Sequence, residues 1–583
     1  MRQEIEGQTG EVTWGARLNR RRFLRLVALG AGAGTLVSLG VACQQAAAPA
    51  PPKPAESKPG EAKPAEAKPA ESKPAAEAKP AQQAPAVAGA SPVIVMQGVD
   101  ANTLDPAFRN SVPEFTMNAH VFSFHTWRDP KSLKIVPEFV QEWKLVDERT
   151  WEFKIPSGAK FHDGTPADAE AVKFSLTRQA KQQVGGKPTI QGTFGRLTSF
   201  DSAEVVNATT VRMKTKDPAA IVPDLLASVE VMPPGVYADE SEANLAKIAT
   251  QPVGSGAYKL VEWVKDDRVV LEAFDGYWGP KPNIKQVIVK PVPELSTRVL
   301  ALQNGQADVI VNVAPDQVPI VERSEKGRIS KVAGGRNIFI GMRYDRPFLT
   351  DKRVRQAFNY AFNFDAVNRA LLNGAGTRTK TILNPPHEPP DVKPYPYDLE
   401  KAKSLLSEAG WKPGSDGILN KDGQKFSVTL MSPSGRYIKD KEIAQAVQQD
   451  LQRLGVEVEL KVLDWSVYAG DILNKRDPSE IFLLGLGAPF TGQEELNYIH
   501  KDFSLNSTHW ENDEYHKLFD ELKVTLDDKK RQDLMNQMWA IAYDDPPWIY
   551  VYHQVDFYGV SKRIEWEAAA TERIRMTEAK LVG

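Results

Sequence analysis

The sequence contains very little cysteine, with Cys43 the single thiol among 583 residues. One thiol excludes an intramolecular disulfide framework and any multi-cysteine zinc or iron–sulfur site. An excess of either charge is also missing, because 73 Lys and Arg face 75 Asp and Glu, for a formal net charge of −2. This balance argues against a nucleic-acid binder that works by bulk charge. At ~150 residues per domain, the length allows two to four lobes.

The 42 prolines are distributed unevenly, and eleven of them lie between residues 44 and 92. This stretch repeats Lys-Pro and otherwise holds mainly Ala, Glu, Ser, Gly and Gln. Such a composition buries too little apolar surface to offset its chain entropy. We therefore predict a disordered tether, partly polyproline II, over residues 43–92. Its lysines and glutamates nearly cancel, so no affinity for an anionic surface follows.

The first 42 residues have the pattern of an export signal. Three arginines, Arg20 to Arg22, precede an uncharged run of Gly, Ala, Leu and Val over residues 26–42. The run is short and weakly apolar for a stable membrane span. The motif Arg-Arg-x-Phe-Leu-Arg at residues 20–25 resembles the twin-arginine signals that export folded proteins. We expect residues 1–42 to be a signal peptide.

Cys43 follows Leu39-Gly-Val-Ala, which resembles a lipoprotein cleavage box. Two interpretations stay open, a lipid-anchored first residue of the mature protein or an incidental thiol in a discarded signal. The position between the apolar run and the tether favours a lipid anchor at Cys43, and thus attachment to the cell membrane.

The body beyond residue 92 reads as mixed α/β and is mildly acidic, which argues against nucleic acid or an anionic membrane surface as its ligand. Capping residues and apolar spacing predict the individual elements. We predict three helices with N-caps at Thr165, Thr350 and Asp398, the last of which ends at Gly410. We also predict a helix over 443–454 that stops at Gly455, and another helix that ends at Gly305. We predict strands at 151–155, 269–273, 285–290, 307–311 and 456–462.

No catalytic or metal-binding motif is found in the sequence. The eight histidines show no short ligand spacing, and Ser255 lacks the flanking residues of a nucleophile elbow. Pro489 interrupts the glycine pair Gly485 and Gly487 where a dinucleotide-binding helix would begin. We therefore expect no catalytic residue, no metal and no cofactor.

Several segments spread over some 490 residues carry, in order, a resemblance to the family 5 solute-binding proteins of ABC importers, the group of dipeptide- and oligopeptide-binding proteins. These segments are 102–106 (Asn-Thr-Leu-Asp-Pro), 136–143, 151–166, 252–258 (Pro-Val-Gly-Ser-Gly-Ala-Tyr), 301–308, 351–357 and 397–402. Each also has a structural explanation. His162 is predicted to be a turn or packing residue, and Gly254 and Gly256 to relieve backbone crowding before Tyr258.

The resemblance implies a two-lobed, periplasmic-binding-protein-like α/β fold of the large type, with mixed sheets and an extra subdomain. It implies a cleft that closes by a hinge over a solute, extracytoplasmic localisation, delivery to ABC transporter permease subunits, and a monomer that is not an enzyme. A secreted hydrolase on a similar body is the alternative. The expected parts are lobe I at 93–335 with a return segment at 546–583, an extra subdomain at about 108–230, lobe II at 336–545, and hinges near 337–340 and 546–550.

Peptide-binding relatives hold the ligand's α-ammonium with an aspartate in a loop of the second lobe, and the matching loop here is 482–493. It contains no acid before Glu494, and a buried ammonium without a countercharge costs several kcal/mol. Glu494 or Glu495 is a possible substitute. The solute class stays open among peptides, oligosaccharides, opines and metal chelates. The candidate ligand-binding residues are Phe108, Trp127, Arg436, Tyr437, Trp465, Gly485 and Phe490.

Overall fold

The structure, a computed structural model, describes residues 91–582 except 110, 190–196, 198, 473–478, 488 and 504–505. The described residues belong to one compact unit. The signal peptide, Cys43 and the tether lie outside the described residues. Among the residues that the structure describes, no helix combines the length and hydropathy needed to span a bilayer.

A ten-stranded mixed sheet runs through this unit. Strand β1 pairs in parallel with β12 and β13, and β18 pairs in parallel with β19 and β20, whereas the other pairs are antiparallel. This arrangement confirms the predicted α/β class with mixed sheets. The strands, in spatial order, are β10 (Tyr258–Val264), β11 (Arg268–Ala273), β12 (Gln286–Pro291), β1 (Val93–Gln97), β13 (Val309–Ile310), β21 (Trp548–Ser561), β14 (Gly327–Met342), β20 (Ile481–Leu486), β18 (Ser427–Ser434) and β19 (Glu457–Asp464).

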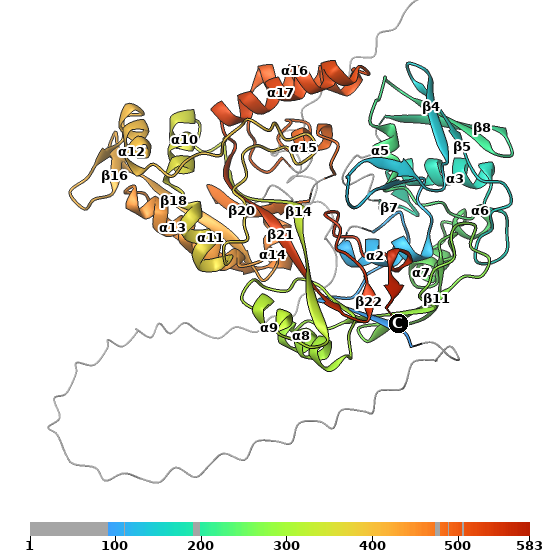
Figure 1. The fold of residues 1–583 in the computed structure, drawn as a ribbon. Helices are drawn as coiled ribbons and strands as arrows, with labels where there is room; N and C mark the ends of the chain where they lie inside the picture. Colours follow the sequence, from blue (N-terminus) through green and yellow to red (C-terminus); the bar gives the residue numbers. More distant parts are fainter. Residues whose placement is uncertain are drawn as a thin grey trace, which may run out of the picture. The chain divides into compact units, whose positions relative to one another are not determined.

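Two strands in the middle of this sheet, β14 and β21, are much longer than their neighbours and run side by side (Figure 1). Their pairing register shifts twice, between Ala333 and Asn337 and between Ile338 and Phe339. Register irregularities of this kind bend a strand pair and increase its twist. The two strands therefore connect the sheet's halves through a locally irregular segment.

Smaller sheets accompany the ten-stranded sheet. A four-stranded sheet has the order β4 (Glu142–Asp147), β5 (Thr150–Lys154), β9 (Thr210–Thr215) and β8 (Phe200–Asn207). The remaining sheets are β2 (Thr126–Arg128) with β3 (Ile135–Pro137), β6 (Gln183–Val184) with β7 (Lys187–Pro188), β22 (Ile564–Glu565) with β23 (Lys580–Leu581), and β15 (Lys412–Pro413) with β16 (Leu419–Lys421) and β17 (Gln424–Lys425).

Separate apolar cores form on either side of the irregular segment. Val428, Leu430 and Ile481 belong to one core, together with helices α10 to α13, and Val95 and Val287 belong to another around β1. A third core lies within 139–231 and buries Phe153, among others, beside the four-stranded sheet. The buried apolar side chains of the described residues therefore form several separate clusters.

The helices cover these sheets. They are α2 (Val112–Val121), α3 (Ala169–Ala180), α5 (Val222–Leu226), α6 (Pro234–Tyr237), α7 (Glu242–Thr250), α8 (Leu295–Asn304), α9 (Val318–Glu322), α10 (Lys352–Ala361), α11 (Phe364–Leu371), α12 (Leu399–Glu408), α13 (Asp440–Arg453), α14 (Trp465–Ile472), α15 (Gln493–Asn497), α16 (Asp513–Val524), α17 (Asp528–Asp544) and the 3-10 helix η1 (Met576–Glu578).

The ends of the helices show which of the predicted capping residues are correct. The Asp398 carboxylate accepts from the Lys401 N–H, and Gly305, Gly410 and Gly455 have positive φ angles of 78°, 93° and 87°, as predicted. The Thr165 and Thr350 predictions are wrong, because Asp168 and Asp351 cap α3 and α10 instead. The predicted strand at 307–311 is also shorter than expected and spans only Val309–Ile310.

His162 packs against the backbone before β10, as predicted. Its Nε2 lies 3.0 Å from the Gly256 carbonyl oxygen, and its ring contacts Phe274 at 4.9 Å between centroids. Burial lowers the pKa of His162 to about 4, so the ring is neutral. A Cβ on Gly254 would lie 2.1 Å from the Val121 carbonyl oxygen, which confirms that this glycine relieves crowding.

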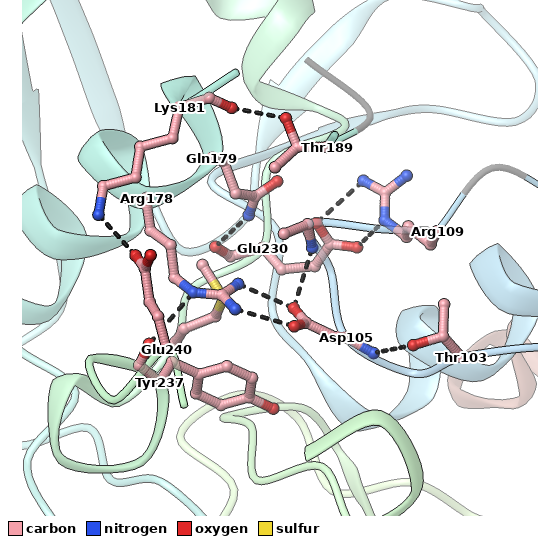
Figure 2. A network of polar contacts seen from close by, with 12 residues as sticks. Thr103, Asp105, Arg109, Arg178, Gln179, Lys181, Thr189, Glu230, Tyr237 and Glu240 are labelled. Atoms are coloured by element: carbon pink, nitrogen blue, oxygen red, sulfur yellow. Dashed lines mark hydrogen bonds and ion pairs between the residues drawn. The ribbon is translucent and has the colours of Figure 1, made fainter. Parts of the chain in front are cut away.

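A buried ion network ties segment 102–109 to α3 and to residues 228–240 (Figure 2). The Arg178 guanidinium donates to both oxygens of Asp105 at 2.8 Å, and both side chains are 1% exposed. Arg178 also donates to the Tyr237 carbonyl, and Arg109 donates to Glu230 at 2.9 Å. The bidentate pairing compensates the charges that burial would otherwise penalise.

Candidate functional site

The turn between β18 and α13 positions the candidate residues Arg436 and Tyr437. The Asp440 carboxylate accepts hydrogen bonds from the backbone N–H groups of residues 435, 436 and 437, at 3.1, 2.8 and 3.0 Å. Asp440 opens α13, so its charge also interacts favourably with the helix N-terminus. The turn is therefore held firmly, and the two side chains leave it in fixed directions.

Tyr437 lies against the backbone of β20. Its hydroxyl donates to the Gly485 carbonyl oxygen at 3.1 Å, and the ring is 7% exposed. A Cβ on Gly485 would lie 2.7 Å from Tyr437 Cε1 and 2.6 Å from Ile338 Cδ1. Any side chain at position 485 would therefore displace the tyrosine, which explains why glycine stands there.

Arg436 stacks on aromatic rings. Its guanidinium carbon lies 5.0 Å from the Trp465 ring centroid and 5.3 Å from that of Tyr437, within the range of cation–π attraction. The rings of Trp465 and Tyr437 meet edge to face at 6.1 Å. Across the described parts of the chain, Arg436 forms no ion pair. Partial desolvation and the like charge of Arg336 lower the pKa of Arg436.

A second arginine, Arg336 of β14, completes this group. It donates to the Gly485 carbonyl at 3.3 Å and forms a bidentate contact with Glu572, with both hydrogen bonds at 3.1 Å. We call Arg336, Arg436, Tyr437, Trp465 and Gly485 the Arg436 cluster. It brings together four of the seven residues predicted from the sequence.

Asp556 adds a buried carboxyl beside this cluster. It is 2% exposed, and its Oδ1 accepts from the Gln554 amide at 2.8 Å. Burial and the like charge of Glu572 raise the pKa of Asp556 to about 7, although Gln554 and Arg336 oppose the shift. Near neutral pH this group therefore changes charge next to the arginine pair.

Trp127 belongs to a different group of residues, next to the return segment of the chain. The guanidinium carbons of Arg575 and Arg573 lie 4.2 and 5.5 Å from its ring centroid. Because Glu572 precedes Arg573 directly, one short segment contacts both the Arg436 cluster and the aromatic group around Trp127. The Arg436 cluster and Trp127 therefore both lie beside residues 572–575.

Phe490 lies apart from the Arg436 cluster, in the loop after β20. It is 3% exposed, and its ring centroid lies 5.7 Å from the guanidinium carbon of Arg128 in β2. The N–H groups of Phe490 and Thr491 donate to Glu495 at 2.9 and 3.2 Å. Burial, together with the charge of Glu494, raises the pKa of Glu495 to about 7. Both oxygens of Glu495 are thus engaged by the loop itself.

Phe108 is placed elsewhere. It is half-buried and packs against the core around β1, so the structure does not bring it to the Arg436 cluster.

Sequence reasoning missed Arg336, Glu572 and Asp556. The one signal for Arg336 was its position next to the predicted hinge at 337–340. Among the described residues, no three His, Cys, Asp or Glu side chains are grouped in a way that could hold a metal ion.

Comparison with known proteins identifies the family. Residues 134–551 match the model of bacterial extracellular solute-binding proteins, family 5. The dipeptide-binding protein of Escherichia coli is 26% identical over 460 residues, which cover 74% of this chain and 83% of the relative. The oligopeptide-binding protein AppA of Bacillus subtilis is 27% identical over 465 residues, covering 76% of this chain and 83% of the relative.

Solved structures share the fold. AppA of Bacillus subtilis, in complex with a nonapeptide, has a TM-score of 0.72 at 23% identity and covers 85% of this chain and 99% of its own. NikA of Brucella suis, in complex with Fe(III)-EDTA, has a TM-score of 0.75 at 21% identity and covers 84% and 100%. The fold is that of the two-domain periplasmic binding proteins. This chain belongs to family 5 of the bacterial extracellular solute-binding proteins.

Proposed function

We propose that this protein captures a solute carrying an anionic group, holds it at the Arg436 cluster between two lobes, and delivers it to an ABC-type importer. Membership of family 5 supports the role in solute capture and delivery. The single observation that carries the anionic solute is Arg436, an exposed guanidinium stacked on Trp465 and Tyr437 with no carboxylate paired to it among the described residues.

The chemistry of the cluster favours a carboxylate as the anionic group. A guanidinium presents its donors in a planar fork that matches a carboxylate in bidentate fashion, and the neighbouring aromatic rings attract it through their faces. The relatives include proteins named for dipeptides, oligopeptides, glutathione and heme, all of which carry carboxylates. A peptide bound through its carboxylate is therefore our proposed solute class.

An ammonium group at the loop after β20 is disfavoured. The described residues of 482–493 include no acid, and the Glu495 oxygens already accept from the loop's own N–H groups. A ligand ammonium there would have to pair with Glu494 or remain without a countercharge, at a cost of several kcal/mol. We therefore propose that the carboxylate end, rather than the ammonium end, anchors the solute.

We propose the following lobe boundaries because the apolar cores are separate from one another. Lobe I spans 93–335 with the return segment 546–583 and includes the extra subdomain at about 108–230, and lobe II spans 336–545. The two register shifts between β14 and β21, beside residues 337–340, support a hinge at this crossing. The core at 139–231 supports a separate subdomain.

We further propose that the protein is exported by the twin-arginine route, anchored through a lipid at Cys43, and active as a monomer. The motif at 20–25 and the small residues before Cys43 support export and anchoring. The family supports an extracytoplasmic binding protein rather than an enzyme. No observation favours the alternative of a secreted hydrolase.

A thermal-shift screen tests this function. Wild type should be stabilised by a carboxylate-bearing solute, because a ligand that binds only the folded state raises Tm. Arg436→Ala should weaken binding at least about tenfold, whereas Lys441→Ala, which removes an exposed charge from α13 nearby, should change it less than about twofold. Equal affinity in Arg436→Ala would overturn the proposed anion site, and turnover of the bound compound would overturn the binding role.

A further inference from the structure

A cavity lies between the loop 386–392 and α17, and none of its lining residues belongs to the Arg436 cluster. It has a volume of about 630 Å³, within the range of small-ligand pockets. One wall is the loop 386–392, and the other is α17, which contributes Gln532, Asn536 and Trp539. These three residues are spaced i, i+4 and i+7, so they share one face of the helix.

The formally charged side chains that line this cavity are both acidic. Glu388 and Asp391 are the formally charged side chains among its described lining residues, and no lysine or arginine lines it. His387 also lines it, but burial lowers the pKa of that ring, Asp224 opposes this shift, and the charges of Arg128 and Arg531 add to it. The ring is therefore neutral at neutral pH. An anionic ligand would find no positive partner on these walls.

Glu388 keeps a negative charge in this setting. Although burial favours the neutral acid, the nearby His553 and Lys380, 3.7 and 3.3 Å from its oxygens, lower the pKa of Glu388. The Oε1 atom of Glu388 is buried and has no hydrogen-bond partner within the described structure. Lys380 compensates the charge of Glu388 only. Asp391 is exposed at the rim of the cavity and has no ion pair among the described residues, so one negative charge of the cavity remains uncompensated.

Trp539 supplies an aromatic wall. It is half-buried, and its ring is held edge to face against Tyr543 at 6.3 Å between centroids. Gln532 donates to the Asn536 side-chain oxygen at 3.1 Å, which holds the two amides next to the indole. Tryptophan is the side chain that attracts a cation over its ring face most strongly.

We propose that this cavity is a binding site for an organic cation of amino-acid side-chain size, a guanidinium or an alkylammonium. The alkyl part would lie along Pro386, Val392 and the Trp539 indole, and the charged end would face Glu388 and Asp391. The site does not depend on the anion site at Arg436. The cation has two sources with the same chemistry, a free organic amine or the basic side chain of a solute held between the lobes.

The test uses the full mature protein labelled with 5-fluorotryptophan and ¹⁹F NMR. The Trp539 resonance is assigned by its disappearance in Trp539→Phe. Titration with n-butylguanidinium chloride should move this resonance saturably, whereas sodium butyrate at equal ionic strength should not. Asp391→Asn should weaken the interaction about threefold, and Glu388→Gln with Asp391→Asn about tenfold or more.

The matched control is Asp533→Asn, an exposed acid on α17 that does not line the cavity. It should leave the titration unchanged. Asp391→Asn lies in an exposed position, so the test stands even if Glu388→Gln fails to fold. A Trp539 resonance that does not move, or that moves equally with butyrate, would overturn the proposal.

Peptide arms separate the two sources. Ala-Arg-Ala should move the Trp539 resonance and Ala-citrulline-Ala should not, because citrulline keeps the shape and lacks the charge. If Arg436→Ala abolishes the peptide effect but preserves that of n-butylguanidinium, the cation arrives as part of the solute. If only the free amine acts, the site is independent of the solute. In the wild-type protein, absence of peptide binding together with an intact n-butylguanidinium response would count against the proposed function alone.

Discussion

Asp105 and Arg178 illustrate how single residues hold segment 102–109 against α3. Their bidentate contact is buried on both sides, so removal of either partner leaves an uncompensated charge (Figure 2). Asp105→Ala should lower the free energy of unfolding by ~3–5 kcal/mol. Urea unfolding followed by circular dichroism would measure this loss.

Lys154 provides the matched control, because its ion pair with Glu142 is exposed on both sides, at 57% and 67%. Lys154→Ala should leave the unfolding midpoint unchanged within error, since solvent and salt screen such pairs. An equal effect of the two substitutions would show that burial does not set the strength of the Asp105 pair.

Asp556 should make stability depend on pH. Its pKa is raised to about 7 from 3.8, chiefly by burial. Between these values the folded protein retains a proton that the unfolded chain releases, so stability falls as pH rises and levels off above about 7. Asp556→Asn should therefore be more stable than wild type above pH 7, by about 1–4 kcal/mol, and equal to it near pH 4.

Thermal unfolding of the solute-free protein between pH 4 and 8 would measure this difference, with Asp533→Asn as the exposed control. A difference between Asp556→Asn and wild type that is constant across this range would contradict the assignment of the proton to this site.

At the scale of elements, the entry to β10 depends on two glycines packed against α2. A Cβ on Gly256 would lie 2.3 Å from the His120 carbonyl oxygen, and one on Gly254 would lie 2.1 Å from that of Val121. Backbone cannot move aside as a flexible side chain does. Gly254→Ala and Gly256→Ala should each destabilise the protein by about 1–3 kcal/mol, measured as a fall in Tm.

Gly235 is the control for this prediction. It lies within α6, and a Cβ there would meet nothing within 4 Å. Gly235→Ala should be neutral or stabilising by up to about 1 kcal/mol, because alanine favours the helix. Destabilisation by all three substitutions alike would show that crowding is not the reason for the two glycines.

Local patterns predicted most elements but not every helix start. The stop of α13 at Gly455 followed from apolar spacing and a glycine, both of which are local signals. The start of α3 did not, because the Thr165 hydroxyl donates to Asp163 within a turn and leaves Asp168 to cap the helix. Thr350 similarly donates to Pro347, and Asp351 caps α10. Competing local hydrogen bonds decide between adjacent capping residues.

At the scale of the whole molecule, the sequence revealed only one side of the candidate site. Arg436, Tyr437, Trp465 and Gly485 lie within fifty residues of one another, and the family resemblance directed attention to their loop. Arg336 and Glu572 come from distant segments that only β14 and the return segment bring together. Sequence spacing carries no signal for a contact across 236 positions.

The proposed membrane anchor is also a property of the whole chain. Cys43→Ala should move the protein from the membrane fraction to the soluble fraction, because no other anchor is predicted. Fractionation with mass spectrometry of the mature N-terminus measures this. An unmodified N-terminus at any residue other than Cys43 would contradict the lipoprotein prediction.

The central claim is that a solute with an anionic group binds at the Arg436 cluster. Native mass spectrometry of the full mature protein, purified without denaturation, tests it most directly. The account predicts a non-covalent adduct whose released compound carries a carboxylate or a similar anion, and predicts its loss in Arg436→Ala but not in Lys441→Ala. An adduct without an acidic group, or one retained fully by Arg436→Ala, would contradict the account.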